Sequence, residues 1–433
     1  MNGHDTTTRT EVLAGITTFL ATMYIIVVNP SILSAAGMPF ASVLTATVLV
    51  CAFSSIMMGV YAKNPIVVAP GMGINAFFAY SVVQGMGVSW QTALGAVFWS
   101  GIVFLVLSVF SIRTWILHAI PRQLRYGVAG GIGLFITFIG LKNAGFVVTD
   151  PVTVVARGAL DSITLTFVFG LALTSVLVAR GVKGALIIGI AVTTVAAIPV
   201  GRLWGDASAV NNGAATLVTY RGLVAPPDFT VFFKLDLAGS LKLAMWPVVF
   251  AFLFTDLFDS LSTFMGVSEA AGLIDKNGEP RNVKQSLIVD ACATVMSGLF
   301  GTSAGTSYIE SAAGIEQGGR RGLTAVVAGV LFLPFMFFSP LLSVVPSVAT
   351  APVLVLVGVF MMGPVLKIRW GRLDDAIPAF LALVLIPLTY SITEGIIWGF
   401  LSWTVIKLST GKAREVSPAL LVIDALAIVS FFV

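Results

Sequence analysis

Two carboxylates, Asp256 and Asp259, stand three residues apart in a stretch that is otherwise mostly apolar from about 241 to 267. Residues at this spacing share one face of an α-helix, and Ser260 and Thr263 extend the same polar stripe. Acids buried in a lipid bilayer are costly and almost always face protein or a water-filled cavity. The stripe is therefore a candidate for substrate binding or proton transfer. The simpler alternative, a structural pair bonded to Ser or Thr of a neighbouring helix, is less favoured because no basic residue stands beside the acids.

Two short segments broken by Gly or Pro, 67–76 and 301–310, carry further polar residues. Each runs into the start of a helix, where Asn75 and Glu310 are expected to lie. Irregular backbone at membrane depth is tolerated only where it is buried in protein or lines a cavity. Interrupted segments at matching places in two halves of a transporter indicate its midplane site. Simpler alternatives stay open: Ser307 and Glu310 could form a capping box, and Asn75 could satisfy free backbone donors.

Aromatic side chains accompany these polar positions, so a flat ligand could stack on one of them. They are Phe77, Phe78, Phe254, Phe258 and Tyr308. The glycines at 127, 130, 131 and 133 do not indicate a phosphate loop, because no Lys-Ser/Thr pair follows them. We expect these glycines to allow close helix packing. The two cysteines, Cys51 and Cys292, provide neither a disulfide framework nor a metal cluster.

The composition is typical of a membrane protein. Hydrophobic residues make up 57% of the 433 residues and charged residues only 10%, whereas a soluble domain carries about 25% charged residues. Long apolar runs follow one another, as transmembrane helices require. The net charge of +4 does not indicate nucleic acid, because the basic residues lie at the ends of the apolar runs. No cleavable signal peptide is expected in the first run.

The apolar runs predict fourteen membrane spans. They lie near 12–29, 39–61, 66–84, 90–112, 122–141, 160–180, 183–201, 241–267, 283–300, 302–318, 321–341, 349–367, 374–391 and 394–408. A last apolar stretch, 417–433, is too short for an assignment. With the amino terminus inside, 18 of the 24 Lys and Arg residues fall on the cytoplasmic side. This asymmetry favours the count and places both termini in the cytoplasm.

The longest polar connection, 202–240, divides the predicted spans into two halves of seven. An odd number of spans in each half makes the second half enter the membrane from the opposite side. That is the condition for an inverted repeat, and each half has its interrupted segment in its third span.

These motifs resemble those of the nucleobase–cation symporters, which include bacterial uracil permease and the nucleobase–ascorbate transporters. They are more similar to the adenine/guanine/hypoxanthine permease branch. The similar segments are 11–20, 24–25, 28–30, 69–76, 254–259 and 301–314. The resemblance extends over nearly the whole chain.

The resemblance implies an all-α polytopic membrane protein with 14 spans in two inverted repeats of seven. Short antiparallel strands would lie in the broken spans 3 and 10. The implied units are a core domain from 1–112 (spans 1–4) and 241–341 (spans 8–11), a gate domain from 113–203 (spans 5–7) and 342–410 (spans 12–14), an external loop at 204–240 and a C-terminal tail at 411–433.

The resemblance maps the family's key acids onto Asp256 and Glu310, with Asn75 and Asp259 in support. Together with the neighbouring residues, the expected substrate-binding residues are Asp256, Glu310, Asn75, Phe254, Tyr308 and Thr306. We expect proton coupling to rest on Asp256, Asp259 and Glu310. Because enclosed acids are costly when charged, Asp256 is expected to carry the proton, and a carboxylate such as Glu310 can accept two N–H bonds from the purine. Uracil permeases carry Glu and a nearby His in span 8, whereas here Asp256 replaces the Glu and both His4 and His118 lie elsewhere. This departure favours the purine branch.

We therefore expect a secondary active transporter that imports adenine, guanine or hypoxanthine with protons across the bacterial inner membrane, by alternating access and without a cofactor. Sodium is the alternative coupling ion. The expected partners are the purine base and the lipid bilayer, not nucleic acid, and a homodimer is left open. A small-anion transporter of the sulfate-permease-like superfamily and a uracil/xanthine permease are the alternatives; buried acids would repel an anion. An enzyme is not expected, because no nucleophile–base pair or metal-ligand spacing is present.

Overall fold

The computed structural model describes residues 6–110, 121–208, 214–220, 222–274 and 280–430. In this part of the chain, eight helical segments are long and apolar enough to cross a membrane. They are Thr8–Ser34, Phe40–Val60, Trp90–Val109, Arg122–Asn143, Ser162–Ala179, Leu243–Ser268, Val283–Phe300 and Ser347–Lys367. The protein is thus a helical, polytopic integral membrane protein, whereas the fourteen-span count stays a prediction.

Two sets of helices differ in the partners that they pack against. The first set contains α1 (Thr8–Thr22), α2 (Ile25–Ser34), α3 (Phe40–Val60), α5 (Trp90–Val109), α10 (Trp246–Ala271), α11 (Val283–Phe300), α12 (Ala312–Glu316) and α13 (Leu323–Phe332). Within it, α11 packs on α3 and α5, α13 packs on α1 and α3, and α10 packs on α5.

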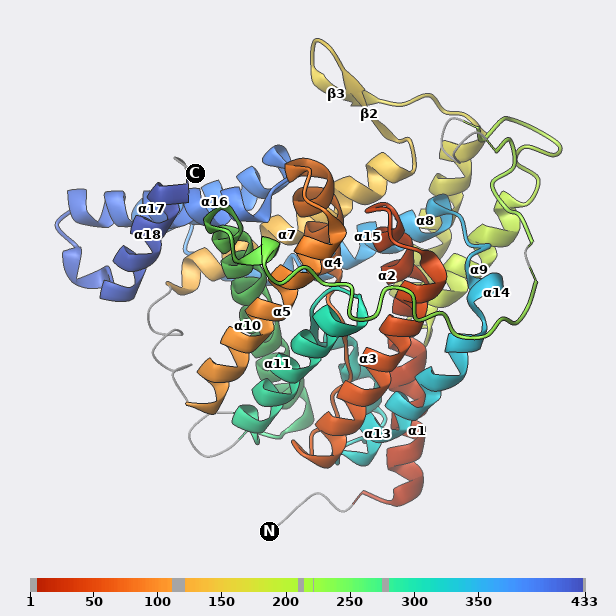
Figure 1. Cartoon of the computed structure of the whole chain (residues 1–433), viewed down its shortest axis with the longest axis horizontal. Helices are drawn as coiled ribbons and strands as arrows, with labels where there is room; N and C mark the ends of the chain where they lie inside the picture. The colour runs from red at the N-terminus through yellow and green to blue at the C-terminus, as the bar shows by residue number, and fades with distance from the viewer. Residues whose placement is uncertain (1–5, 111–120, 209–213, 221, 275–279, 431–433) are drawn as a thin grey trace.

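The second set contains α7 (Arg122–Asn143), α8 (Ser162–Ala179), α9 (Ala185–Ala197), α15 (Ser347–Phe360), α16 (Leu373–Thr389) and α17 (Ile392–Ser409). Here α7 packs on α15 and α16, α16 packs on α17, and α15 packs on α8 and α9. In Figure 1, α16 and α17 lie at the left, α8 and α9 at the right, and α7 and α15 between them.

The glycines of α7 let neighbouring backbones approach this helix closely. A Cβ atom on Gly127 would lie 2.3 Å from the carbonyl oxygen of Ala379 in α16. A Cβ on Gly133 would lie 2.9 Å from the carbonyl oxygen of Gly358 in α15. Small residues permit this kind of close helix contact in membranes. The predicted packing role of these glycines is confirmed.

Two short strands from distant parts of the chain meet at the centre of the first set. The place where they pair is called the strand crossing below. β1 (Val68–Pro70) and β4 (Gly305–Ser307) pair antiparallel, with Ala69 opposite Thr306. Both strands are fully buried, so the pairing satisfies backbone groups that water cannot reach. β1 leads into α4 (Met72–Ala76) and the π-helix η1 (Phe77–Gly85), and β4 leads into η4 (Ile309–Ser311) and α12. The strands lie in the two interrupted segments; their place in spans 3 and 10 stays a prediction with the span count.

The remaining elements are short or peripheral. They are β2 (Val147–Asp150), β3 (Val154–Arg157), η2 (Gly239–Leu241), η3 (Leu243–Met245), η5 (Leu333–Phe337), α14 (Ser339–Leu342), η6 (Gly363–Lys367), η7 (Ala413–Glu415) and α18 (Pro418–Ser430). β2 and β3 form a hairpin that projects beyond the helices in Figure 1. The C-terminal stretch that the sequence left unassigned contains α18, which packs against α17 and α10.

Candidate functional site at the strand crossing

The strand crossing brings together the polar residues that the sequence singled out. α10 packs against β4 and η4, which places the Asp256–Asp259 stripe beside Thr306 and close to the start of α12. The Ser260 hydroxyl lies 2.9 Å from the Thr306 hydroxyl, and the Thr306 hydroxyl is within hydrogen-bonding reach of Asp259. The two polar segments therefore form one site.

Asp256 is buried, and no residue in the part of the chain that the structure describes forms an ion pair with it. Its side chain is 1% exposed, and Oδ2 accepts a hydrogen bond from the Thr294 hydroxyl of α11. Its other oxygen, Oδ1, and the neighbouring Thr255 hydroxyl have no hydrogen-bond partner among the described residues. The ion pairs that the structure describes lie around Arg372 and Lys407 instead. Because an unpaired buried charge is costly, this carboxyl group is suited to carry a proton.

Asp290 is a site residue that the sequence analysis missed. It lies in α11 and is 0% exposed, and the Ser307 hydroxyl is 3.0 and 3.1 Å from its two carboxylate oxygens. The Ser260 hydroxyl is within reach of both Asp256 and Asp290. The sequence did contain a signal for Asp290, because an acid within the apolar stretch 283–300 indicates a functional position. It was missed because Asp290 has no second acid at helical spacing beside it.

Hydroxyl groups connect the buried Asp256 and Asp290 with the partly buried Asp259 around β4. Ser260 reaches Asp256 and Asp290, and its contact with Thr306 continues to Asp259. A hydroxyl both donates and accepts, so this connection can hold a shared proton at more than one carboxylate. Acids that interact in this way titrate as a group rather than independently, so the arrangement is suited to sharing a proton.

The hydrogen-bond partners of Glu310 and Asn75 differ from those expected for the simpler alternatives. These alternatives were a capping box of Ser307 with Glu310, and Asn75 as a partner for free backbone donors. The Tyr24 hydroxyl donates to Glu310 Oε1 at 2.6 Å. The Ser307 hydroxyl bonds to Asp290, not to the backbone of the following turn, so the capping-box alternative is wrong. Asn75, which is 0% exposed, accepts from the Ser303 hydroxyl, and its Nδ2 has no partner among the described residues. It caps no backbone donor of α4.

The aromatic candidates differ in their surroundings. The Tyr308 hydroxyl donates to the carbonyl oxygen of Pro70 at 2.5 Å, which fastens the end of β1. Phe254 packs against Phe258, with ring centroids 4.6 Å apart, and edge-on against Phe400 of α17 at 5.4 Å. The Arg125 guanidinium of α7 lies 5.1 Å from the centre of the Phe258 ring. Side chains of the second helix set thus contact the aromatic edge of the α10 stripe.

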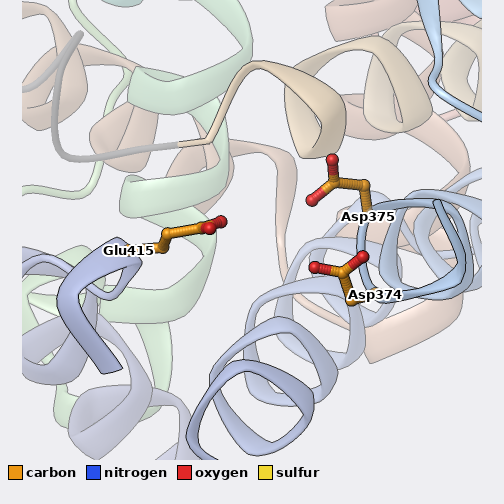
Figure 2. Close-up of side chains that lie close together, drawn as sticks. All are labelled: Asp374, Asp375 and Glu415. Atoms are coloured by element: carbon orange, nitrogen blue, oxygen red, sulfur yellow. The ribbon is translucent and has the colours of Figure 1, made fainter. Parts of the chain in front are cut away.

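A second acidic group, away from the strand crossing, is neutralised by cations. Figure 2 shows Asp374 and Asp375, at the start of α16, facing Glu415. The Lys407 ammonium lies 2.6, 2.7 and 2.7 Å from these three carboxylates and is fully buried. Lys412 adds a contact of 2.6 Å to Asp374. The ammonium takes the place that a metal ion would need, so this group is an ion-pair network that ties α16 to α17.

Comparisons with known proteins relate the chain to membrane permeases. Residues 9–397 match the model Xan_ur_permease, described as "Permease family". The chain is 45% identical over 428 residues to adenine permease AdeP of Escherichia coli (strain K12), covering 98% of this chain and 93% of that protein. It is 42% identical over 435 residues to guanine/hypoxanthine permease PbuO of Bacillus subtilis (strain 168), covering 99% and 98%.

A solved structure with the same fold is the transmembrane domain of a cyanobacterium bicarbonate transporter, BicA. The TM-score is 0.63 at 15% sequence identity, over 90% of this chain and 97% of that chain. At this identity the likeness concerns the fold alone.

Proposed function

The chain belongs to the Xan_ur_permease family, and on this premise we propose that it imports purine bases with protons as a secondary active transporter. It is a permease and not an enzyme. The names of AdeP and PbuO support adenine, guanine or hypoxanthine as the substrate. The charge asymmetry supports an orientation with both termini in the cytoplasm, and the bacterial relatives AdeP and PbuO support a location in the bacterial plasma (inner) membrane.

The observation that carries the proposal is a group of buried and partly buried acids around the strand crossing, which form no ion pair among the described residues, next to an amide with a free donor. Glu310 presents an acceptor for a purine N–H, and Asn75 presents its unpartnered Nδ2 to a purine nitrogen or oxygen acceptor. Each buried polar group left unpaired costs about 1–3 kcal/mol. A purine that pairs with these groups therefore binds better than an apolar ring of equal size.

Asp256 is the proposed proton carrier. Its free Oδ1 and its lack of a cation make the protonated form the less costly one in an apolar surrounding. Asp259 and Asp290 share the proton through Ser260 and Thr306. Proton binding also removes one negative charge from the site, which lowers the cost of moving it past the apolar contacts of the second helix set.

The two helix sets are the proposed core and gate domains of an alternating-access cycle, arranged as two inverted repeats of seven spans. Both strands and all four acids belong to the first set and to segments within it. The second set touches the α10 stripe through Arg125 and Phe400. Movement of one set against the other would expose the site to each side in turn without breaking the strand pair. A homodimer stays a prediction.

A small-anion transporter is the second candidate, favoured by the shared fold with the bicarbonate transporter BicA. The four acids around the site oppose it, because carboxylates beside a bound anion raise the cost of binding. Uptake separates the candidates. A purine-uptake-deficient strain that expresses the chain is given labelled adenine, guanine, hypoxanthine, xanthine, uracil and bicarbonate. We expect accumulation of an unmodified purine; uptake of bicarbonate without any purine would overturn the proposal.

A further inference from the structure

The first membrane segment is broken where it passes the site. α1 ends at Thr22 and α2 begins at Ile25, with a turn at Met23 and Tyr24 between them. The Tyr24 side chain is 1% exposed. Its position at the break places this tyrosine beside Glu310, which follows it in the chain by more than 280 positions.

The Tyr24 hydroxyl is aimed at the carboxylate of Glu310. It donates to Oε1 at 2.6 Å and is the one side chain, in the part of the chain that the structure describes, that hydrogen-bonds Glu310. The rings of Tyr24 and Tyr308 lie 6.5 Å apart, but the Tyr308 hydroxyl bonds to the carbonyl oxygen of Pro70 instead. One tyrosine thus holds the strand and the other holds the acid.

We propose that Tyr24 is a positioning and specificity-determining residue that engages Oε1 of Glu310 and makes Oε2 the stronger acceptor for the purine. This inference rests on the proposed function. Each carboxylate oxygen has two lone pairs, so Oε1 can still accept a second N–H bond, but there the purine competes with the Tyr24 hydroxyl. Guanine and hypoxanthine both carry the ring N1–H, and only guanine adds a 2-amino group. The Tyr24 bond therefore reduces what guanine gains from pairing its 2-amino group with Oε1.

Removing the Tyr24 hydroxyl should have two effects. Glu310 loses the bond that fixes its rotamer, so purine affinity falls. Oε1 becomes free to accept from the 2-amino group, so the preference for guanine over hypoxanthine rises. A residue that merely supports the fold would lower the affinity for both purines by the same factor.

The test measures dissociation constants for guanine and hypoxanthine with purified, full-length protein. We expect Tyr24→Phe to weaken hypoxanthine binding about tenfold, as for loss of a hydrogen bond to a charged group, and to raise the guanine-over-hypoxanthine ratio at least threefold. Tyr80→Phe is the matched control: Tyr80 is also a buried tyrosine, but its hydroxyl accepts from Asn143. This control should leave the ratio unchanged. Tyr24→His keeps a ring N–H donor and should restore part of the affinity.

A double-mutant cycle with Glu310→Met tests whether Tyr24 acts through Glu310, and it is read as the melting temperature of the purine-free protein because Glu310 variants are expected to lose purine binding. Methionine has no carboxylate to accept the bond, so Tyr24→Phe should lower the melting temperature less in this background than in the wild type. An unchanged ratio in Tyr24→Phe, or equal melting-temperature losses with Glu310 present and absent, would overturn the inference while leaving purine transport intact. If the wild-type protein binds no purine, the proposed function fails, and this inference fails with it.

Discussion

The substitution Asp256→Asn tests proton coupling with little disturbance of the fold. Asparagine can keep an oxygen where the Thr294 hydroxyl donates, and its amide NH2 then replaces Oδ1, which already lacks a partner. The change therefore exchanges one unpaired acceptor for one unpaired NH2 group, which carries two N–H donors, with a cost of about 1–3 kcal/mol for the buried group. The amide also resembles the protonated acid, so substrate binding should survive while the cycle loses its titratable carrier.

The expected loss follows from the driving force. For one proton per purine, each pH unit contributes about 1.4 kcal/mol and each 100 mV of membrane potential about 2.3 kcal/mol. With both applied, coupled transport can approach an accumulation of about 500-fold, whereas an uncoupled carrier stops at equal concentrations. In proteoliposomes with an imposed gradient, Asp256→Asn should bring labelled purine only to equilibrium, and its counterflow should not depend on pH between pH 5 and pH 8.

Asp424→Asn provides the matched control. Asp424 in α18 is also buried, accepts from a threonine hydroxyl, Thr404, and has an unpartnered Oδ1. It lies on another helix, so its substitution should leave accumulation intact. The reasoning is refuted if Asp256→Asn still concentrates purine and a protonophore still abolishes the gradient. The proton would then be carried elsewhere, with Asp290 or Glu310 as the next candidate.

Three further outcomes are expected. Glu310→Gln should lose purine binding while the protein still reaches the membrane; an unchanged dissociation constant in purified protein would remove Glu310 from the site. Lys407→Met leaves three carboxylates without their shared cation and should destabilise the protein by about 3–5 kcal/mol, seen as a lower melting temperature in detergent; an unchanged melting temperature contradicts this. In a cysteine-free background, a cysteine at Asn211 should react with an impermeant thiol reagent on intact cells, and one at Asn277 only after permeabilisation. Both positions lie outside the described residues, and the reverse pattern would invert the predicted topology.

The sequence could predict those parts of the site that depend on spacing within one segment. The three-residue interval of Asp256 and Asp259 and the Gly/Pro breaks before Asn75 and Glu310 marked the segments that meet at the strand crossing. The family resemblance drawn from these motifs is confirmed by the permease family match and by the purine permeases among the relatives.

Partners across the fold could not be predicted in this way. The Ser307 hydroxyl had a local option in the turn that follows it, and the structure gives it to Asp290 instead. The bond from Tyr24 to Glu310 joins residues that no pattern of spacing relates. A lone acid such as Asp290 also carries no periodic signal. Each of these contacts depends on which helices pack together. The spacing of residues within one sequence does not indicate that packing.

In the proposed transport cycle, the strand crossing would keep the acids in place while the contacts between the two helix sets change. β1 and β4 satisfy each other's buried backbone groups, and Tyr308 fastens the end of β1. The site therefore keeps its shape without help from the second helix set, which touches it through side chains such as Arg125 and Phe400. Ring and cation contacts of this kind are each worth about 0.5–2 kcal/mol, so they can break and re-form in a transport cycle, whereas opening the buried strand pair would leave several backbone groups without partners. We infer that motion occurs between the helix sets, and that the acids travel with the strands as one rigid unit.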